Sequence, residues 1–133
     1  MKVDVIIEQN SKGRYSAYIN DDRIPFGVLG EGNSVEETIE DFKIGYEEIK
    51  EAYQCVGKTV PELEFCFKHD IASFLSLYSK ELTLAGLSRI TKVNKGQLSH
   101  YVTGRKRPRA NTINKIRTSV RNFGSTLSKV EFA

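Results

Sequence analysis

The sequence predicts an α+β protein of two domains. Residues 1–67 are expected to form three strands, a helix and a fourth strand, and residues 70–133 an all-α domain of five short helices. The first observation behind this prediction is the spacing of apolar residues, which alternate along several segments of the first part and recur at steps of three and four in the second. The change of period predicts a change of structural class near residue 70.

Charge separates at the same place. Up to Asp70 the chain has eight Lys and Arg against fifteen Asp and Glu, whereas the rest has twelve against two. The two parts therefore differ in net charge, −7 against +10, although the whole chain is only +3. A basic module attracts polyanions and an acidic one repels them, so different partners are expected.

The first domain begins with a predicted hairpin. Residues 2–8 alternate apolar and polar side chains, residues 9–13 (QNSKG) have turn composition, and residues 15–19 alternate again. A shorter third strand is expected over residues 26–29, before a bend at residues 30–32.

A capping box predicts the start of the helix. Ser34 and Glu37 have the S-x-x-E spacing in which each side chain satisfies a free backbone N–H of the first turn. One apolar stripe then follows at helical steps, formed by Val35, Ile39, Phe42, Tyr46, Ile49 and Tyr53. The stripe is expected to cover one face of the sheet, and residues 63–67 alternate as the last strand.

Helical patterns continue from residue 70 onward. Asp70 and Asn94 are suitable N-caps for the first and third helices. The five helices are expected at about residues 70–80, 84–90, 94–102, 113–123 and 127–130. Between the second and third, a short connection with small Ser88 at the crossing predicts a helix-turn-helix. Its apolar contacts are expected from Leu84, Leu87, Val93, Leu98 and Val102.

The outward surface of the third helix is expected to be polar. Such side chains form hydrogen bonds with base edges and phosphates in a major groove. The candidates for this surface are Lys95, Gly96, Gln97, Ser99 and His100.

The segment from Thr83 to Gly104 resembles the helix-turn-helix of the Cro and phage-repressor family, often called the XRE family. The resemblance covers about residues 71–130, and it places Thr83 at the helix opening and Lys95, Gly96, Gln97 and His100 at base-reading positions. Lys92 stands where the family usually has Gly, which calls for a left-handed backbone there, and Leu84 replaces a usual polar residue.

A basic segment follows directly. Residues 105–109 read RKRPR, four cations in five residues with no acidic neighbour. Neutralising phosphates dominates non-specific affinity for DNA, so Arg105, Lys106 and Arg107 are expected to contact the backbone.

The first domain resembles the HicB-type antitoxin domain, a reduced RNase H-like fold. The similar residues are GEGNSVEETIED, from Gly30 to Asp41, with Thr38 where the family commonly has Ala, and residues 21–27 depart from its usual signature. The resemblance implies an antitoxin that neutralises a small basic RNA-cleaving toxin and represses its own operon as a homodimer or higher oligomer on double-stranded DNA. Toxin contacts are expected among Tyr15, Tyr18, Phe26, Glu36 and Glu40, with Glu47 and Glu51 extending the acidic face.

Two alternatives stay open. One is a stand-alone regulator whose first domain senses a ligand or only dimerises. The other is a metal-dependent nuclease, for which Asp4, Glu8, Asp21 and Asp22 would have to converge on divalent metal. We expect instead that these carboxylates form a polar face and a turn, so no enzyme activity, metal or cofactor is predicted.

The remaining composition excludes several classes of protein. Cys55 and Cys66 are too few for a disulfide framework and lack zinc-site spacing, and His69 is expected to be an exposed linker residue. No apolar run approaches the roughly 18 residues of a transmembrane helix, so a cytoplasmic protein is expected.

Overall fold

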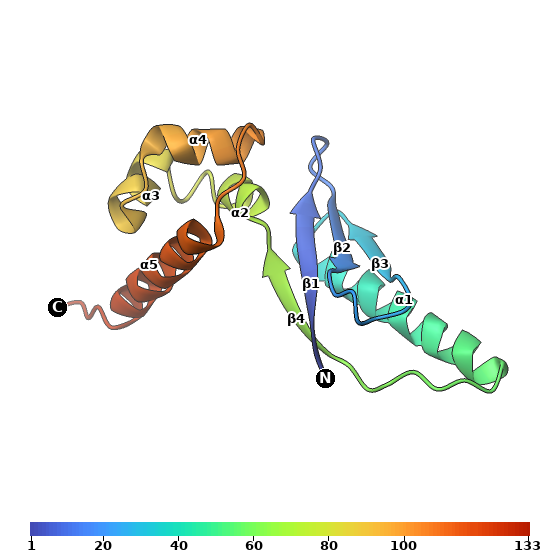
Figure 1. Cartoon of the computed structure of the whole chain (residues 1–133). Helices are drawn as coiled ribbons and strands as arrows, with labels where there is room; N and C mark the ends of the chain where they lie inside the picture. The colour runs from blue at the N-terminus through green and yellow to red at the C-terminus, as the bar shows by residue number, and fades with distance from the viewer. The chain divides into compact units, whose positions relative to one another are not determined.

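The computed structural model describes all residues from Met1 to Ala133, and the chain divides into two compact units, Met1–Asp70 and Ile71–Ala133 (Figure 1). The first unit contains β1 (Lys2–Gln9), β2 (Tyr15–Ile19), β3 (Leu29–Gly32), α1 (Val35–Cys55) and β4 (Glu64–His69). The second contains α2 (Ile71–Leu77), α3 (Leu84–Thr91), α4 (Lys95–Thr103) and α5 (Ala110–Ser128).

The four strands form one sheet in the order β3-β2-β1-β4. β2 is antiparallel to both β1 and β3, whereas β4 is parallel to β1. The β1–β2 turn is closed by Asn10, whose side-chain oxygen accepts hydrogen bonds from the backbone N–H groups of Lys12 and Arg14 at 2.9 and 3.0 Å. The sequence therefore predicted the hairpin correctly, and the parallel position of β4 follows from the crossover through α1.

One face of the sheet is covered by α1 (Figure 1). Val3, Val5 and Ile7 of β1 are buried beneath it, and Phe42 of the helix is fully buried. Phe42 meets Phe65 of β4 edge to face, with ring centroids 5.0 Å apart. The buried alternate residues of β1 and the apolar stripe of α1 thus pack into one core, as the strand and helix periods predict.

The third strand differs from the prediction. It spans Leu29–Gly32, and residues 30–32 belong to the strand instead of forming a bend. A Cβ atom at Gly30 would lie 2.5 Å from the backbone N of Phe42 and from the carbonyl O of Thr38. Glycine is required at position 30 because α1 passes directly over this strand. A bend and a close approach both favour glycine, so the sequence alone does not distinguish them.

The helix α1 begins at the predicted cap. Ser34 accepts a hydrogen bond from the backbone N–H of Glu37 at 3.1 Å. The carboxylate of Glu37 accepts from the backbone N–H of Asn33 at 2.9 Å, one residue before the Ser34 N–H that a capping box uses.

The second unit has four helices, so the prediction of five was wrong. The helix α5 is continuous from Ala110 to Ser128 and includes Leu127, which was assigned to a separate fifth helix. Neither proline nor a cap interrupts it, and Gly124 alone does not end a helix whose neighbours keep helical spacing. The core of the unit comprises Leu75, Leu87, Val93, Leu98, Tyr101 and Ile116.

Candidate nucleic-acid interface

The helix α3 starts at Thr83. The Thr83 hydroxyl oxygen accepts a hydrogen bond from the backbone N–H of Gly86 at 3.0 Å, which satisfies one of the free donors of the first turn. Because a threonine hydroxyl has one proton of its own, Thr83 can still donate to an outside acceptor such as a phosphate oxygen. Leu84 packs on the core, which agrees with its predicted apolar role.

Three residues form the turn from α3 to α4. Lys92 ends α3 with φ 61° and ψ 19°, the left-handed conformation expected from the sequence, and its backbone N–H donates to the carbonyl of Ser88 at 2.9 Å. The Ser88 hydroxyl donates to the carbonyl of Val93 at 2.7 Å. The buried hydroxyl of Thr91 donates to the carbonyl of Leu87 and accepts from the N–H of Val93, at 2.7 and 3.2 Å.

The rest of the unit also holds the turn, because Lys115 Nζ of α5 donates to the carbonyl of Lys92 at 3.3 Å and Val93 packs in the core. Ser88 was predicted at the helix crossing for its small size, and its hydroxyl has the further role of fixing the turn residue Val93. The role of Thr91 was missed at the sequence level, because a threonine at a helix end has several common uses and only its burial reveals this one.

The helix α4 is oriented by its buried side. Asn94 caps it as predicted, accepting from the N–H of Gly96 at 2.7 Å. Leu98 and Tyr101 enter the core. The opposite side therefore faces solvent, and Lys95, Gly96 and Gln97 are exposed while Ser99 and His100 are half-buried. The first turn of α4 thus presents Lys95, Gly96 and Gln97 to solvent, and Ser99 and His100 of the next turn are only partly accessible.

His100 is less free than expected. Its Nδ1 atom is buried and has no hydrogen-bond partner. The buried Nδ1 is not available to an outside partner, so a contact between His100 and a base edge would use Nε2.

The basic loop follows α4 directly. Gly104 ends α4 with φ 77°, and Arg105, Lys106 and Arg107 are all exposed. All ion pairs of the structure lie in the first unit, so no carboxylate neutralises these three cations. The loop keeps its full positive charge beside the polar turn of α4.

The aromatic residues expected to contact a toxin are largely engaged within the first unit. Tyr15 is only 6% exposed and belongs to the core, so its assignment as a partner contact was wrong. Phe26 packs against the rings of Tyr46 and Tyr53, at centroid distances of 6.5 and 5.7 Å. Tyr18 lies on the uncovered face of the sheet and donates to the carboxylate of Glu8 at 2.7 Å. Side-chain direction in β2 decides the outcome for Tyr15 and Tyr18, and the ring contacts of a loop decide it for Phe26.

The acidic face of α1 forms a second exposed surface. Its members, spaced at steps of three and four, are Glu36, Glu40, Ile44, Glu47 and Glu51, all exposed. Ile44 is 54% exposed, although the predicted stripe contains only the apolar residues of the other face. The sequence signal for this exposed apolar residue was that Ile44 does not belong to the apolar stripe of the helix.

The carboxylates considered for a nuclease do not converge. Asp4 accepts from Lys68 Nζ at 2.6 Å, and Asp21 accepts from Arg23 Nε at 2.8 Å. The hydrogen bond from Arg23 lowers the pKa of Asp21 to about 2. No group of three or more metal-ligating side chains is found, and Cys55 and Cys66 are free thiols. His69 is exposed but ends β4 instead of lying in a linker.

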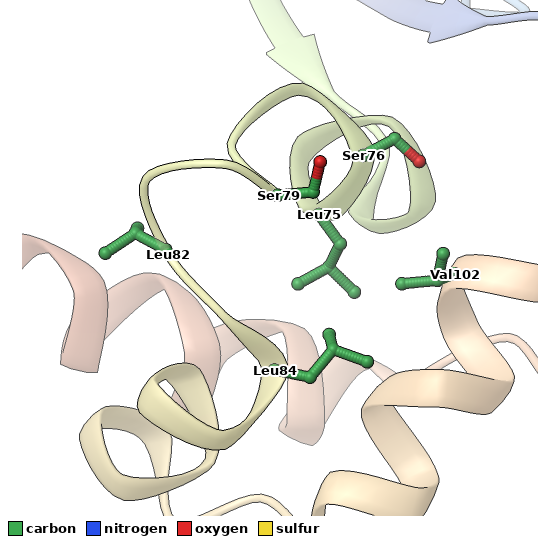
Figure 2. A pocket seen from close by; sticks show the side chains of 6 residues that line it. All are labelled: Leu75, Ser76, Ser79, Leu82, Leu84 and Val102. Carbon is green, nitrogen blue, oxygen red and sulfur yellow. The ribbon is translucent and has the colours of Figure 1, made fainter.

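An apolar groove of about 260 Å³ lies in the second unit. Figure 2 shows Leu75, Leu84 and Val102 directed toward the same space, with Ser76 and Ser79 nearby. The groove has no charged lining residue, so it offers nothing to a polyanion.

Comparison of the chain with protein-family models, with curated proteins and with solved structures found no match. None of the helices combines the length and the apolar character that crossing a membrane requires.

Proposed function

We propose that the unit Ile71–Ala133 binds double-stranded DNA and that the protein is a transcriptional repressor. The observation that carries the proposal is the capped α3–turn–α4 arrangement, in which the exposed start of α4 is followed by a basic loop free of internal ion pairs. A helix presented in this way fits a major groove with its N-terminal residues toward the bases.

The side chains divide by role. Gln97 and His100 are proposed to contact base edges, since an amide is both donor and acceptor and an imidazole nitrogen can form a hydrogen bond with a base. Thr83, Lys95 and Ser99 are proposed as further contacts with the same DNA, and Gly96 is exposed, so a phosphate or base edge can approach its backbone closely. Arg105, Lys106 and Arg107 neutralise phosphates on the same duplex.

Affinity measurements test this division. The full chain is used to select its preferred sequence from a random duplex library, and binding to that site and to unrelated DNA is then compared. Gln97→Ala is expected to cost about 1 to 3 kcal/mol on the selected site and little on unrelated DNA. Arg105→Ala weakens both equally and flattens the salt dependence. Lys58→Ala, which removes an exposed cation of the first unit, serves as the matched control.

Two results would contradict the proposal. One is a library selection that enriches no sequence at all. The other is an equal loss for Gln97→Ala on both kinds of DNA, which would remove Gln97 from the bases and leave only electrostatic binding.

We further propose that the first unit is an antitoxin module that binds a small basic RNA-cleaving toxin. The observation that supports it is the acidic face of α1, where exposed Ile44 lies among Glu36, Glu40, Glu47 and Glu51. A toxin that binds RNA is cationic, so the carboxylates would speed its encounter with the antitoxin. An apolar residue among charged ones has the pattern of an interface core and its rim.

Co-expression with the neighbouring reading frame tests the antitoxin proposal. The full chain is expected to rescue growth from a toxic neighbour, and Ile44→Asp to abolish the rescue. Val56→Asp is the matched control, because Val56 is also exposed, at 69%, but lies beyond α1. A neighbour that is not toxic, or rescue unaffected by Ile44→Asp, would remove the antitoxin assignment and leave a stand-alone regulator that binds DNA.

A further inference from the structure

Lys92, in the turn before α4, is the one residue other than glycine whose backbone is left-handed, at φ 61°. This conformation brings the Cβ atom close to the following carbonyl oxygen, and glycine avoids the contact because it has no Cβ. A lysine keeps such a conformation only where the surrounding structure holds it. The contacts of Lys92 therefore show what fixes the turn.

Hydrogen bonds hold Lys92 on both sides. Its backbone N–H donates to the carbonyl of Ser88 at 2.9 Å, and its own carbonyl accepts from Lys115 Nζ of α5 at 3.3 Å. The N–H of the next residue, Val93, donates to the Thr91 hydroxyl at 3.2 Å. Among these groups, only the Lys115 ammonium comes from another helix, so it links the turn to α5.

The contact also fits the charge at this end of α3. The last carbonyl groups of a helix have no donors within it and carry partial negative charge, so a nearby cation is favourable. No carboxylate competes for Lys115, because residues 82–130 contain no Asp or Glu and all ion pairs of the structure lie in the first unit. The ammonium is thus available to the backbone carbonyl of Lys92.

We propose that Lys115 is a positioning residue for DNA reading, which holds the left-handed turn and so sets the direction of α4. The inference rests on the proposed DNA binding of this unit. Lys92 lies two residues before the cap Asn94, so a change in its φ would rotate the start of α4, where Lys95 and Gln97 are exposed. A displacement of about 1 Å there is enough to break a hydrogen bond to a base, since such bonds form only over a narrow range of distances.

Positioning and phosphate binding by Lys115 predict different losses. A phosphate contact weakens binding to every sequence and flattens the salt dependence. A positioning contact weakens binding to the selected site, where bases are read, and leaves the salt dependence and the affinity for unrelated DNA at the level that the loss of one charge explains.

Affinity measurements on the full chain separate the two roles. Lys115→Met keeps most of the side chain and removes the ammonium, and Arg117→Met is the matched control because it removes the same charge from another exposed position of α5. On the selected site, Lys115→Met is expected to bind about five- to tenfold more weakly than Arg117→Met. On unrelated DNA the two variants should bind equally. Lys115→Arg, which keeps a cationic donor, should restore binding to the selected site.

Hydrogen exchange without DNA reports on the turn itself. Lys115→Met should lower the protection of the Val93 amide, whereas Arg117→Met should leave it unchanged. Replacing Lys92 by glycine then tests the reason for the contact, because glycine adopts the left-handed conformation without strain. In the Lys92→Gly chain, the excess loss caused by Lys115→Met should shrink to less than about twofold.

Two results would overturn the proposal. One is an equal loss for Lys115→Met and Arg117→Met on the selected site while Gln97→Ala still distinguishes that site from unrelated DNA, which would leave DNA binding standing and remove the role of Lys115. The other is an undiminished effect of Lys115→Met in the Lys92→Gly chain, which would show that Lys115 does not act through the left-handed turn.

Discussion

Thr91→Val is expected to destabilise the turn between α3 and α4. The side chain is 1% exposed, and valine replaces the hydroxyl by a methyl group of similar size, so the substitution leaves no cavity in the core. The hydroxyl is lost, however, and with it the acceptor for the backbone N–H of Val93, which lies at 3.2 Å in a buried position. Leaving a buried donor without a partner costs about 1 to 3 kcal/mol.

Thermal denaturation measures this cost. For a unit of this size, a loss of about 2 kcal/mol in the free energy of unfolding lowers the Tm by on the order of 10 °C. The Tm is read from the helical circular dichroism signal of the full chain. Hydrogen exchange of the Val93 amide reports the lost bond directly, and its protection should fall more than that of Leu98. The matched control is Thr118→Val on the exposed face of α5, expected within about 0.5 kcal/mol of wild type. A Thr91→Val chain as stable as this control would refute the role given to the hydroxyl.

Three other changes have clear expected outcomes. Gly30→Ala should destabilise the first unit by about 1 to 3 kcal/mol in chemical denaturation, since the added Cβ would meet the backbone of α1. Gly27→Ala is the control and should leave the stability unchanged, because nothing lies within 4 Å of a Cβ at this position. Equal effects of the two substitutions would contradict the close approach of α1 to β3. Asn94→Ala removes the cap of α4 and should cost about 1 kcal/mol in the same measurement. Asp21→Asn should be less stable than wild type at neutral pH. Because the folded pKa of Asp21 is lowered to about 2, this difference should shrink as pH falls from about 4 to 2, and a difference independent of pH would exclude the Arg23 bond as its cause.

The sequence by itself determined the local structure of this protein. Alternation predicted β1 and β2, and helical spacing predicted α1, α3 and α4, because these periods depend only on backbone geometry. The caps Ser34 and Asn94 were also readable, since a cap acts within one turn of its own residue, whereas Thr83 was placed at a helix opening only by the family resemblance. The left-handed backbone at Lys92 was expected from the family resemblance alone, because that family usually has Gly at this position.

Only the tertiary structure decided which faces are buried and which remain free. Tyr15 lies in the core and Ile44 in solvent, although residue type alone favours neither outcome. The glycine at position 30 belongs to a strand because a helix distant in sequence crosses it, and the stripe of α5 is half buried because the core ends at Val120. These features depend on contacts between segments far apart in the chain, and periodicity within one segment contains no information about what will pack against it.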